Sequence, residues 1–497
     1  MNHDTSPAAH AATTWDVSTA AGSDPSAPVY GPCSPAMLTD LYELTMAAAY
    51  HEAGLNHEAT FELSVRELPP NRRFLLAAGL DEALAGLEAF RFTDRDLSYL
   101  DGLGQMPSGF LRKLADLRFT GEVWAVPEGE VVFAGEPLVR VTAPLLEAQL
   151  VETFLLNQIA SHTMVASKAA RVALACGARS FVDFSARRDH GASAAMAAAR
   201  AAWIAGSAGT SLTAAGQRWG IPVSGTMAHS FVMSFDDERD AFRAYARAFP
   251  TRAVLLIDTY DTVSGARHAI DVARELAEEG VALAGVRLDS GDLAWLSRAV
   301  RQLLDEAGMV ETEILASGDL DEYRIADLLA GGAPIDAFGV GTQLGTSGDA
   351  PALGAVYKLV EDARGPRMKL AVDKVTLPGR KQVWRCAASD VVGLHGEDVP
   401  DGRPLLERVM ANGTRLRTLD HPLEAARQRC RAALDWLPTA LRTLKREPTG
   451  RQWSVEHSAG LRQLAGAVRA RLAEADRKAQ SSMPGSANTG TRTATTT

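Results

Sequence analysis

The chain has 497 residues, of which 46% are hydrophobic and 23% charged, so it has the apolar material for a large core and is not an intrinsically disordered chain. Its formal net charge of -10 does not indicate a nucleic-acid-binding protein, and no run of about 18 uncharged apolar residues predicts a membrane-spanning helix. The four cysteines are far apart and lack zinc-binding spacing, as expected for reduced thiols in a cytoplasmic protein.

Both ends of the chain are predicted to be disordered tails, over 1–28 and 480–497, because they are rich in small and polar residues. The first tail lacks the basic start and apolar stretch of a secretory signal. Residues 29–144 predict an N-terminal α+β domain. Its expected elements are a helix over 36–53 and strands at 59–68, which alternates apolar and polar residues, at 123–126 and within 131–141.

A repeating strand–helix pattern then predicts the catalytic domain over 145–375. A long helix is expected over 145–175, ending before Gly177. The expected strands are 180–184, 221–223, 254–257, 283–288, 313–316 and 335–340, and the expected helices between them are 193–205, 238–248, 264–279, 292–307 and 321–330. Such alternation predicts a parallel sheet with crossover helices, either a closed β/α barrel or an open doubly wound sheet. Residues 376–479 have mixed character and end in two amphipathic helices.

Polar residues and glycines follow each expected strand. These segments are 185–191, 224–230, 258–262, 287–292, 317–319 and 339–342. Since the carboxyl ends of parallel strands meet at one edge, they predict an active site there.

Two of these segments contain glycines suited to an anion. Ser317-Gly318 and Gly339-Val340-Gly341-Thr342 follow adjacent expected strands. Glycine lets the backbone approach a phosphate closely, and consecutive N–H groups can point at it. The alternative is that these are only tight turns that need positive φ, but the pair on adjacent strands favours a phosphate cradle.

Three arginines supply positive charge at the same edge. Arg287 stands in an apolar strand, where burial demands an anionic partner, either a substrate or an internal aspartate. Arg187 and Arg188 form a second cationic cluster suited to phosphate or carboxylate.

Aspartates and one histidine complete the predicted site. The pairs Asp258/Asp261 and Asp289/Asp292 could hold Mg²⁺ or stabilise a developing positive charge. For Asp292 the alternative of capping the following helix is favoured, and for Asp289 a functional role. His229 is a candidate for proton transfer or phosphoryl acceptance.

Five segments resemble motifs of the nicotinate phosphoribosyltransferase family. They are 38–46 (LTDLYELTM), 225–235 (GTMAHSFVMSF), 285–293 (GVRLDSGDL), 338–342 (FGVGT) and 374–383 (KVTLPGRKQV). The resemblance runs in order from about Pro35 to Arg385 and is weaker to about 470.

The resemblance implies an irregular β/α barrel of the type II phosphoribosyltransferases, with an N-terminal α+β domain and a C-terminal extension over 376–479 that packs on it. It implies a homodimer that makes nicotinate mononucleotide from nicotinate and phosphoribosyl pyrophosphate, with ATP as co-substrate and Mg²⁺, in NAD salvage. His229 matches the family's transiently phosphorylated histidine. Tyr42, Thr226, Arg287 and Thr342 match residues at the nicotinate site. Arg187 or Arg188 matches a substrate-contacting arginine, and which one is left open, as is the carboxylate that holds Mg²⁺.

Departures from the family pattern leave alternatives open. Gly318 stands where the family often has Asn, which removes a side-chain contact but not the backbone cradle. The related nicotinamide enzyme has an acid shortly after a Gly-Thr pair, whereas here Ser211 follows Gly209-Thr210, which favours the acid substrate. A nicotinamide- or quinolinate-type transferase is the alternative activity. A catalytically silent homologue is opposed by the intact His229, Arg287 and glycine segments.

Overall fold

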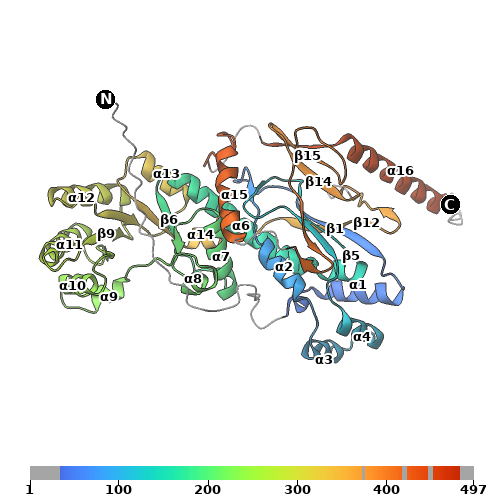
Figure 1. The fold of residues 1–497 in the computed structure, drawn as a ribbon, viewed down its shortest axis with the longest axis horizontal. Helices are drawn as coiled ribbons and strands as arrows, with labels where there is room; N and C mark the ends of the chain where they lie inside the picture. The colour runs from blue at the N-terminus through green and yellow to red at the C-terminus, as the bar shows by residue number, and fades with distance from the viewer. Residues whose placement is uncertain (1–33, 372–374, 417–421, 446–451, 482–497) are drawn as a thin grey trace, which may run out of the picture.

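Two sheets of different kinds organise the molecule in the computed structural model, which describes residues 34–371, 375–416, 422–445 and 452–481 (Figure 1). An antiparallel sheet lies on one side and a parallel sheet with its helices on the other. The expected tail over 1–28, most of the tail from 480, Cys33 and Lys374 lie outside the described residues.

The antiparallel sheet has seven strands drawn from both halves of the chain. Their order is β13 (Gly365–Pro366), β12 (Ala355–Asp362), β1 (Glu58–Val65), β5 (Pro137–Pro144), β3 (Glu122–Ala125), β17 (Glu407–Ala411) and β18 (Thr414–Arg415). Two smaller sheets adjoin it: β2 (Leu75–Leu76) with β4 (Val131–Val132), and β16 (Arg403–Pro404), β14 (Lys381–Arg385), β15 (Ser389–Leu394) and β19 (Ser454–His457). Strands β17 and β18 come after the parallel sheet in the chain and complete the antiparallel sheet beside β3.

The helices of this half are short, apart from two near the end of the chain. They are η1 (Pro35–Met37), α1 (Leu41–Glu52), α2 (Leu80–Glu88), α3 (Asp94–Gly102), α4 (Ser108–Asp116), α5 (Leu145–Leu150), α15 (Pro422–Trp436) and α16 (Ala459–Ser481). The strand expected at 59–68 is present as β1. Its apolar and polar residues alternate in sequence, but both of its faces are buried, because β1 is an inner strand between β12 and β5 and α5 packs against it.

The parallel sheet curls as a half-barrel. Its strand order is β7 (Gly209–Thr210), β6 (Ser180–Asp183), β11 (Ala337–Val340), β10 (Glu313–Ala316), β9 (Leu283–Leu288) and β8 (Ala253–Leu256). The helices around it are α6 (Glu152–Cys176), α7 (Ala192–Ile204), α8 (Thr213–Trp219), α9 (His229–Met233), α10 (Glu238–Ala248), α11 (Thr262–Ala277), α12 (Leu293–Glu306), α13 (Glu322–Ala330) and α14 (Thr342–Gly345). Buried residues such as Val286, Ile314 and Phe338 form its core.

Two expectations about this half are corrected. The stretch 221–223 is not a strand, and only Val223 makes an isolated bridge to Thr210 of β7. The expected helix over 145–175 is two helices, because Val151 (φ -93°, ψ 0°) separates α5 from α6.

Strand β12 joins the antiparallel sheet although it follows the parallel one in the chain. The domain limits 29–144, 145–375 and 376–479 stay predictions.

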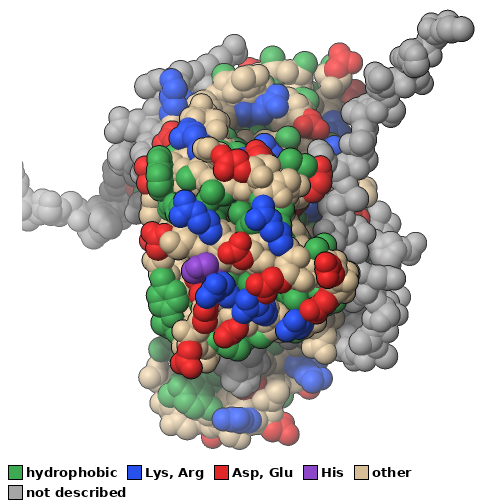
Figure 2. All heavy atoms as spheres, turned by 90° about the vertical axis from the view of Figure 1, so that its left-hand side faces the viewer, with side chains coloured by type: hydrophobic (Ala, Val, Ile, Leu, Met, Phe, Trp, Pro, Cys, Tyr) green, Lys and Arg blue, Asp and Glu red, His purple; other side chains and the backbone are tan. Residues whose placement is uncertain are grey.

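Within the described ranges, no helix combines the length and apolar character needed to cross a bilayer. Cys176, Cys386 and Cys430 are free thiols. On the face over α10, α11 and α12, basic and acidic side chains are interspersed (Figure 2). Arg243 of α10 pairs with Glu275 of α11, and Arg247 of α10 pairs with Glu279 just after α11.

Candidate active site

A cleft of about 450 Å³ opens at the carboxyl ends of the parallel strands, where the sequence predicts the site. Ten of the predicted site residues line it, whereas Tyr42, His229 and the metal candidates Asp258, Asp261 and Asp292 do not. The ten are Arg187, Arg188, Thr226, Arg287, Asp289, Ser317, Gly318, Gly339, Gly341 and Thr342. Met227 and Asp319, which lie within the predicted segments 224–230 and 317–319, also line the cleft. Sequence reasoning did not assign Phe184 and Leu320 to it. Each of these two is adjacent in the chain to a predicted site segment, which is the signal that could have found them.

Arg287 is the half-buried cation of the cleft, with its side chain 11% exposed. Its Nη1 donates to the Thr226 hydroxyl at 2.6 Å and to the Met227 carbonyl at 3.2 Å. Its Nη2 lies 3.6 Å from Asp289 Oδ1, and its buried Nε–H has no hydrogen-bond partner among the described residues. Burial lowers the pKa of Arg287, Asp289 opposes this, and Arg187 adds to it. The ion pair between Arg287 and Asp289 is loose, and three arginines line the same cleft.

His229 begins α9 at the side of the cleft and is 38% exposed. Its Nδ1 lies 3.1 Å from the Thr259 hydroxyl, and its Nε2 lies 3.9 Å from Asp289 Oδ2. Asp258 supports Asp289 from behind, because Asp258 Oδ2 accepts hydrogen bonds from the Asp289 backbone N–H at 2.9 Å and from Ser290 at 2.6 Å. The imidazole therefore has one nitrogen held by a hydroxyl and the other beside a cleft carboxylate.

Both glycine segments are tightly packed: Gly318 lies in the bend after β10, and Gly339 lies within β11. Gly318 has φ +89°, and a Cβ there would overlap the Asp289 carbonyl oxygen. A Cβ at Gly339 would overlap the Phe184 ring. The Ser317 hydroxyl donates to Asp289 Oδ1 and fixes that carboxylate. Glycine is required at Gly318 by its positive φ and at Gly339 by the close approach of the Phe184 ring. The alternative of a turn that needs positive φ therefore holds at Gly318, and both segments also line the cleft.

The remaining aspartates are caps. Asp292 accepts a hydrogen bond from the Trp295 backbone N–H at the start of α12, which confirms the capping interpretation. Asp261, grouped with the metal candidates from sequence, caps α11 through the Ser264 backbone N–H.

Ser211, which follows the Gly-Thr pair, lines the cleft.

Tyr42 is not part of the cleft in this chain. It lies on α1, 46% exposed, in the half of the molecule that holds the antiparallel sheet (Figure 1). Burial raises the pKa of its hydroxyl, and the nearby Glu152 and Glu43 raise it further.

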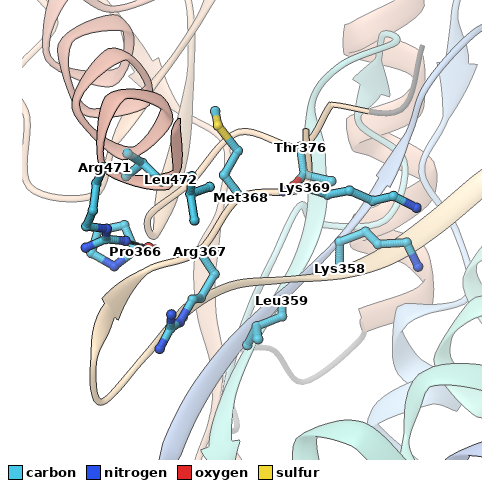
Figure 3. Close-up of a pocket in the computed structure, with 10 residues that line it drawn as sticks. Lys358, Leu359, Pro366, Arg367, Met368, Lys369, Thr376, Arg471 and Leu472 are labelled. Carbon is cyan, nitrogen blue, oxygen red and sulfur yellow. Dashed lines mark hydrogen bonds between the residues drawn. The ribbon is translucent and has the colours of Figure 1, made fainter. Parts of the chain in front are cut away.

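A second cavity, of about 360 Å³, lies between β12, β13 and α16 (Figure 3). Its basic side chains are largely engaged: Arg367 pairs with Asp362 at 2.9 Å, and Arg471 donates to the Pro366 carbonyl at 2.7 Å. None of the predicted site residues lines it, so the cleft at the strand ends is the candidate active site.

Comparison with known proteins gives a consistent result. Residues 37–160 match the model of the nicotinate phosphoribosyltransferase N-terminal domain, and residues 179–360 match the model of the nicotinate phosphoribosyltransferase family. A Mycobacterium tuberculosis nicotinate phosphoribosyltransferase (pncB2) is 52% identical over 425 residues, which cover 84% of this chain and 91% of that protein. The Bacillus subtilis nicotinate phosphoribosyltransferase is 46% identical over 383 residues, covering 74% and 78%.

The fold has the same relatives. The crystal structure of human nicotinic acid phosphoribosyltransferase matches with a TM-score of 0.77 and 30% identity, over 86% of this chain and 99% of that one. A nicotinate-nucleotide pyrophosphorylase from Pyrococcus furiosus shares the fold, with a TM-score of 0.67 at 23% identity over 81% of this chain and 96% of that one. The two family models together span more than half of the chain, and the chain belongs to the nicotinate phosphoribosyltransferase family.

Proposed function

We propose that this protein transfers the phosphoribosyl group of phosphoribosyl pyrophosphate to nicotinate and so forms nicotinate mononucleotide and pyrophosphate for NAD salvage. The observation that carries the proposal is Arg287, a half-buried guanidinium whose Nε–H has no partner in the part of the chain that the structure describes, in the same cleft as two glycine segments. That combination suits an aromatic carboxylate and a sugar phosphate at once.

Nicotinate is recognised through its carboxylate. Arg287 is held by Thr226 and by the Met227 carbonyl, which leaves donors for an anionic partner. Ser211 adds no negative charge to the cleft, so an acid is not repelled there. Family membership and these two residues favour nicotinate over the amide.

The sugar donor is held by its phosphates. Backbone N–H groups at Gly318, Gly339 and Gly341 suit the 5′-phosphate, and Arg187 and Arg188 suit an anionic group of either substrate. The pyridine nitrogen attacks the anomeric carbon, the bond to the pyrophosphate oxygen breaks, and pyrophosphate leaves with the electron pair. The transition state carries positive charge on the ribose, which the Asp289 carboxylate stabilises.

Magnesium fits this site only together with substrate phosphates. The described residues hold no cluster of three or more His, Cys, Asp or Glu side chains. Asp258 Oδ1 is buried without a hydrogen-bond partner among the described residues, and Asp289 lines the cleft. Mg²⁺ is commonly bound by one or two carboxylates plus phosphate oxygens, so Asp289 and Asp258 are the residues that would hold it. The ion would neutralise charge on the departing pyrophosphate.

His229 couples ATP to the transfer. In the tautomer whose Nδ1–H donates a hydrogen bond to the Thr259 hydroxyl, Nε2 keeps the lone pair that attacks the γ-phosphorus of ATP, and ADP leaves. The phosphoryl group adds nearly two negative charges beside the cleft. This changes substrate affinity until the phosphohistidine is hydrolysed.

Tyr42 enters the site through a homodimer. One protomer would present Tyr42 to the cleft of its partner, which accounts for the distance of α1 from the cleft within one chain (Figure 1). We expect a cytoplasmic enzyme. Sedimentation of the purified protein tests the dimer, and a monomer at assay concentration that is fully active would contradict it.

The reaction is tested by assaying nicotinate mononucleotide formation with and without ATP, using nicotinamide and quinolinate as alternative acceptors. We expect turnover with nicotinate and stimulation by ATP. Preference for nicotinamide or quinolinate would overturn the proposal, and Ser211→Asp is the variant expected to weaken nicotinate use.

A further inference from the structure

The loop between β6 and α7 carries Arg187 and Arg188 into the cleft, and two carboxyl groups hold it from behind. The Ser185 hydroxyl oxygen lies between them, 2.6 Å from Asp183 Oδ1 and 3.0 Å from Asp189 Oδ2. A hydroxyl has only one proton to donate. Both contacts are therefore hydrogen bonds only when one of the two carboxyl groups is itself protonated.

The surroundings assign that proton to Asp189. Asp183 also accepts the Ser185 backbone N–H at 2.9 Å and the Thr210 hydroxyl at 2.8 Å. Burial raises the pKa of Asp183, and its three hydrogen bonds from Ser185 and Thr210 lower it by stabilising the charged form. Asp189 Oδ1, in contrast, is buried and has no hydrogen-bond partner among the described residues. A protonated Asp189 donates to the Ser185 oxygen, and that hydroxyl donates to Asp183.

Burial and the charge on Asp183 both favour the protonated form of Asp189. Burial raises the pKa of Asp189 to about 6; the Ser185 hydrogen bond and His190 lower it, and the charge on Asp183 raises it. Helix α14 packs over this carboxyl and brings no charged side chain. The packing is close, because a Cβ at Gly345 would overlap both Asp189 Oδ1 and the Ser185 side chain.

We propose that Asp189 is a positioning residue that acts in its protonated form, by completing the chain Asp189–Ser185–Asp183 that fixes the loop bearing Arg187 and Arg188. When the proton leaves to solvent, one hydrogen bond is lost and two carboxylates face each other across one hydroxyl. The loop then loosens, and the arginines bind anionic substrate less tightly. This inference rests on the proposed function for its kinetic readout.

The same residues join two walls of the cleft. The Asp183 carboxylate binds the Thr210 side chain of β7, and the Asp183 carbonyl accepts the Ser211 backbone N–H at 2.8 Å. Loosening the Ser185 end therefore acts on the arginine loop while Ser211 stays held by the backbone. We expect the effect in KM for phosphoribosyl pyrophosphate and little effect in kcat.

The kinetic test compares the wild type with Asp189→Asn and Asp189→Ala from about pH 5.5 to about pH 7.5, a range that spans the titration of Asp189. The asparagine amide donates to Ser185 at every pH. We expect the ratio of the wild-type KM to the Asp189→Asn KM to rise about 3- to 10-fold over this range. This corresponds to the free energy that one hydrogen bond contributes. Asp189→Ala should have the raised KM at both ends. Asp305→Asn, the same change at an exposed residue of α12, should keep a constant ratio to the wild type.

Identical pH profiles for the wild type and Asp189→Asn would overturn the inference. A second measurement does not depend on turnover: chemical denaturation of the same two proteins. Because the folded-state pKa of Asp189 is raised, its stabilisation is complete below the unfolded value and is lost as pH rises through about 6. The wild type should lose stability relative to Asp189→Asn over that range, and a constant difference would contradict the inference. Absence of turnover in the wild type, with the stability difference present, would overturn only the proposed function.

Discussion

Replacing Arg287 with alanine separates a substrate-binding role from a structural one. The guanidinium is held by the Thr226 hydroxyl and the Met227 carbonyl, and its nearest carboxylate, Asp289, is 3.6 Å away. A loose internal pair leaves the charge for a ligand. A charge-assisted hydrogen bond contributes about 1.5–3 kcal/mol, and about 1.4 kcal/mol is a factor of ten. We therefore expect Arg287→Ala to raise KM for nicotinate about 100-fold.

The assay is steady-state turnover with nicotinate varied at saturating donor, together with chemical denaturation of each variant. Arg301→Ala is the matched control, because Arg301 on α12 pairs with Asp305 at 2.8 Å and donates to the Thr312 carbonyl at 2.7 Å, outside the cleft. It should change stability and leave KM unaltered. An unchanged KM in Arg287→Ala with reduced stability would refute the reasoning and would assign Arg287 to an internal ion pair.

Three other predictions address different parts of the account. His229→Ala should abolish ATP stimulation and leave ATP-independent transfer; intact stimulation, measured as product formed with and without ATP, would refute the phosphohistidine assignment. Ser211→Asp should raise KM for nicotinate about 10-fold or more through like-charge repulsion in the cleft, and an unchanged KM would remove Ser211 from the acceptor site. Burial raises the pKa of Glu43 from 4.5 to about 7, so its stabilisation is lost as pH rises through 7. Relative to Glu43→Gln, the wild type should lose about 1–2 kcal/mol of unfolding free energy between pH 4.5 and 8, allowing for solvent screening; denaturation curves that stay parallel would contradict this.

Local sequence patterns predicted the parallel sheet well because each strand is an apolar run that ends in polar residues. Strands β9 and β10 have the predicted bounds, 283–288 and 313–316. Strand β7 was not predicted, because Gly209–Thr210 is only two residues long and has no apolar run. Strand β12 pairs with β1 from the other end of the chain, a long-range contact with no local signal.

The sequence allowed the location of the candidate site to be predicted, but not most of the contacts between its residues. Parallel topology brings the strand ends together, so residues of five of the six predicted segments meet in one cleft, and 258–262 is the segment that does not line it. Tertiary packing decided the rest: Gly318 is required because the Asp289 backbone approaches it, and Phe184 forms a wall of the cleft because it packs on Gly339. The carboxyl pair around Ser185 depends on side-chain geometry that spacing does not encode.

A crystal structure with nicotinate mononucleotide and pyrophosphate bound tests the central claim most directly. The account predicts the pyridine carboxylate on Arg287 and the 5′-phosphate at the backbone of Gly318 and Gly341. Ligand density against the cavity beside β12 and α16, with the strand-end cleft vacant, would contradict it.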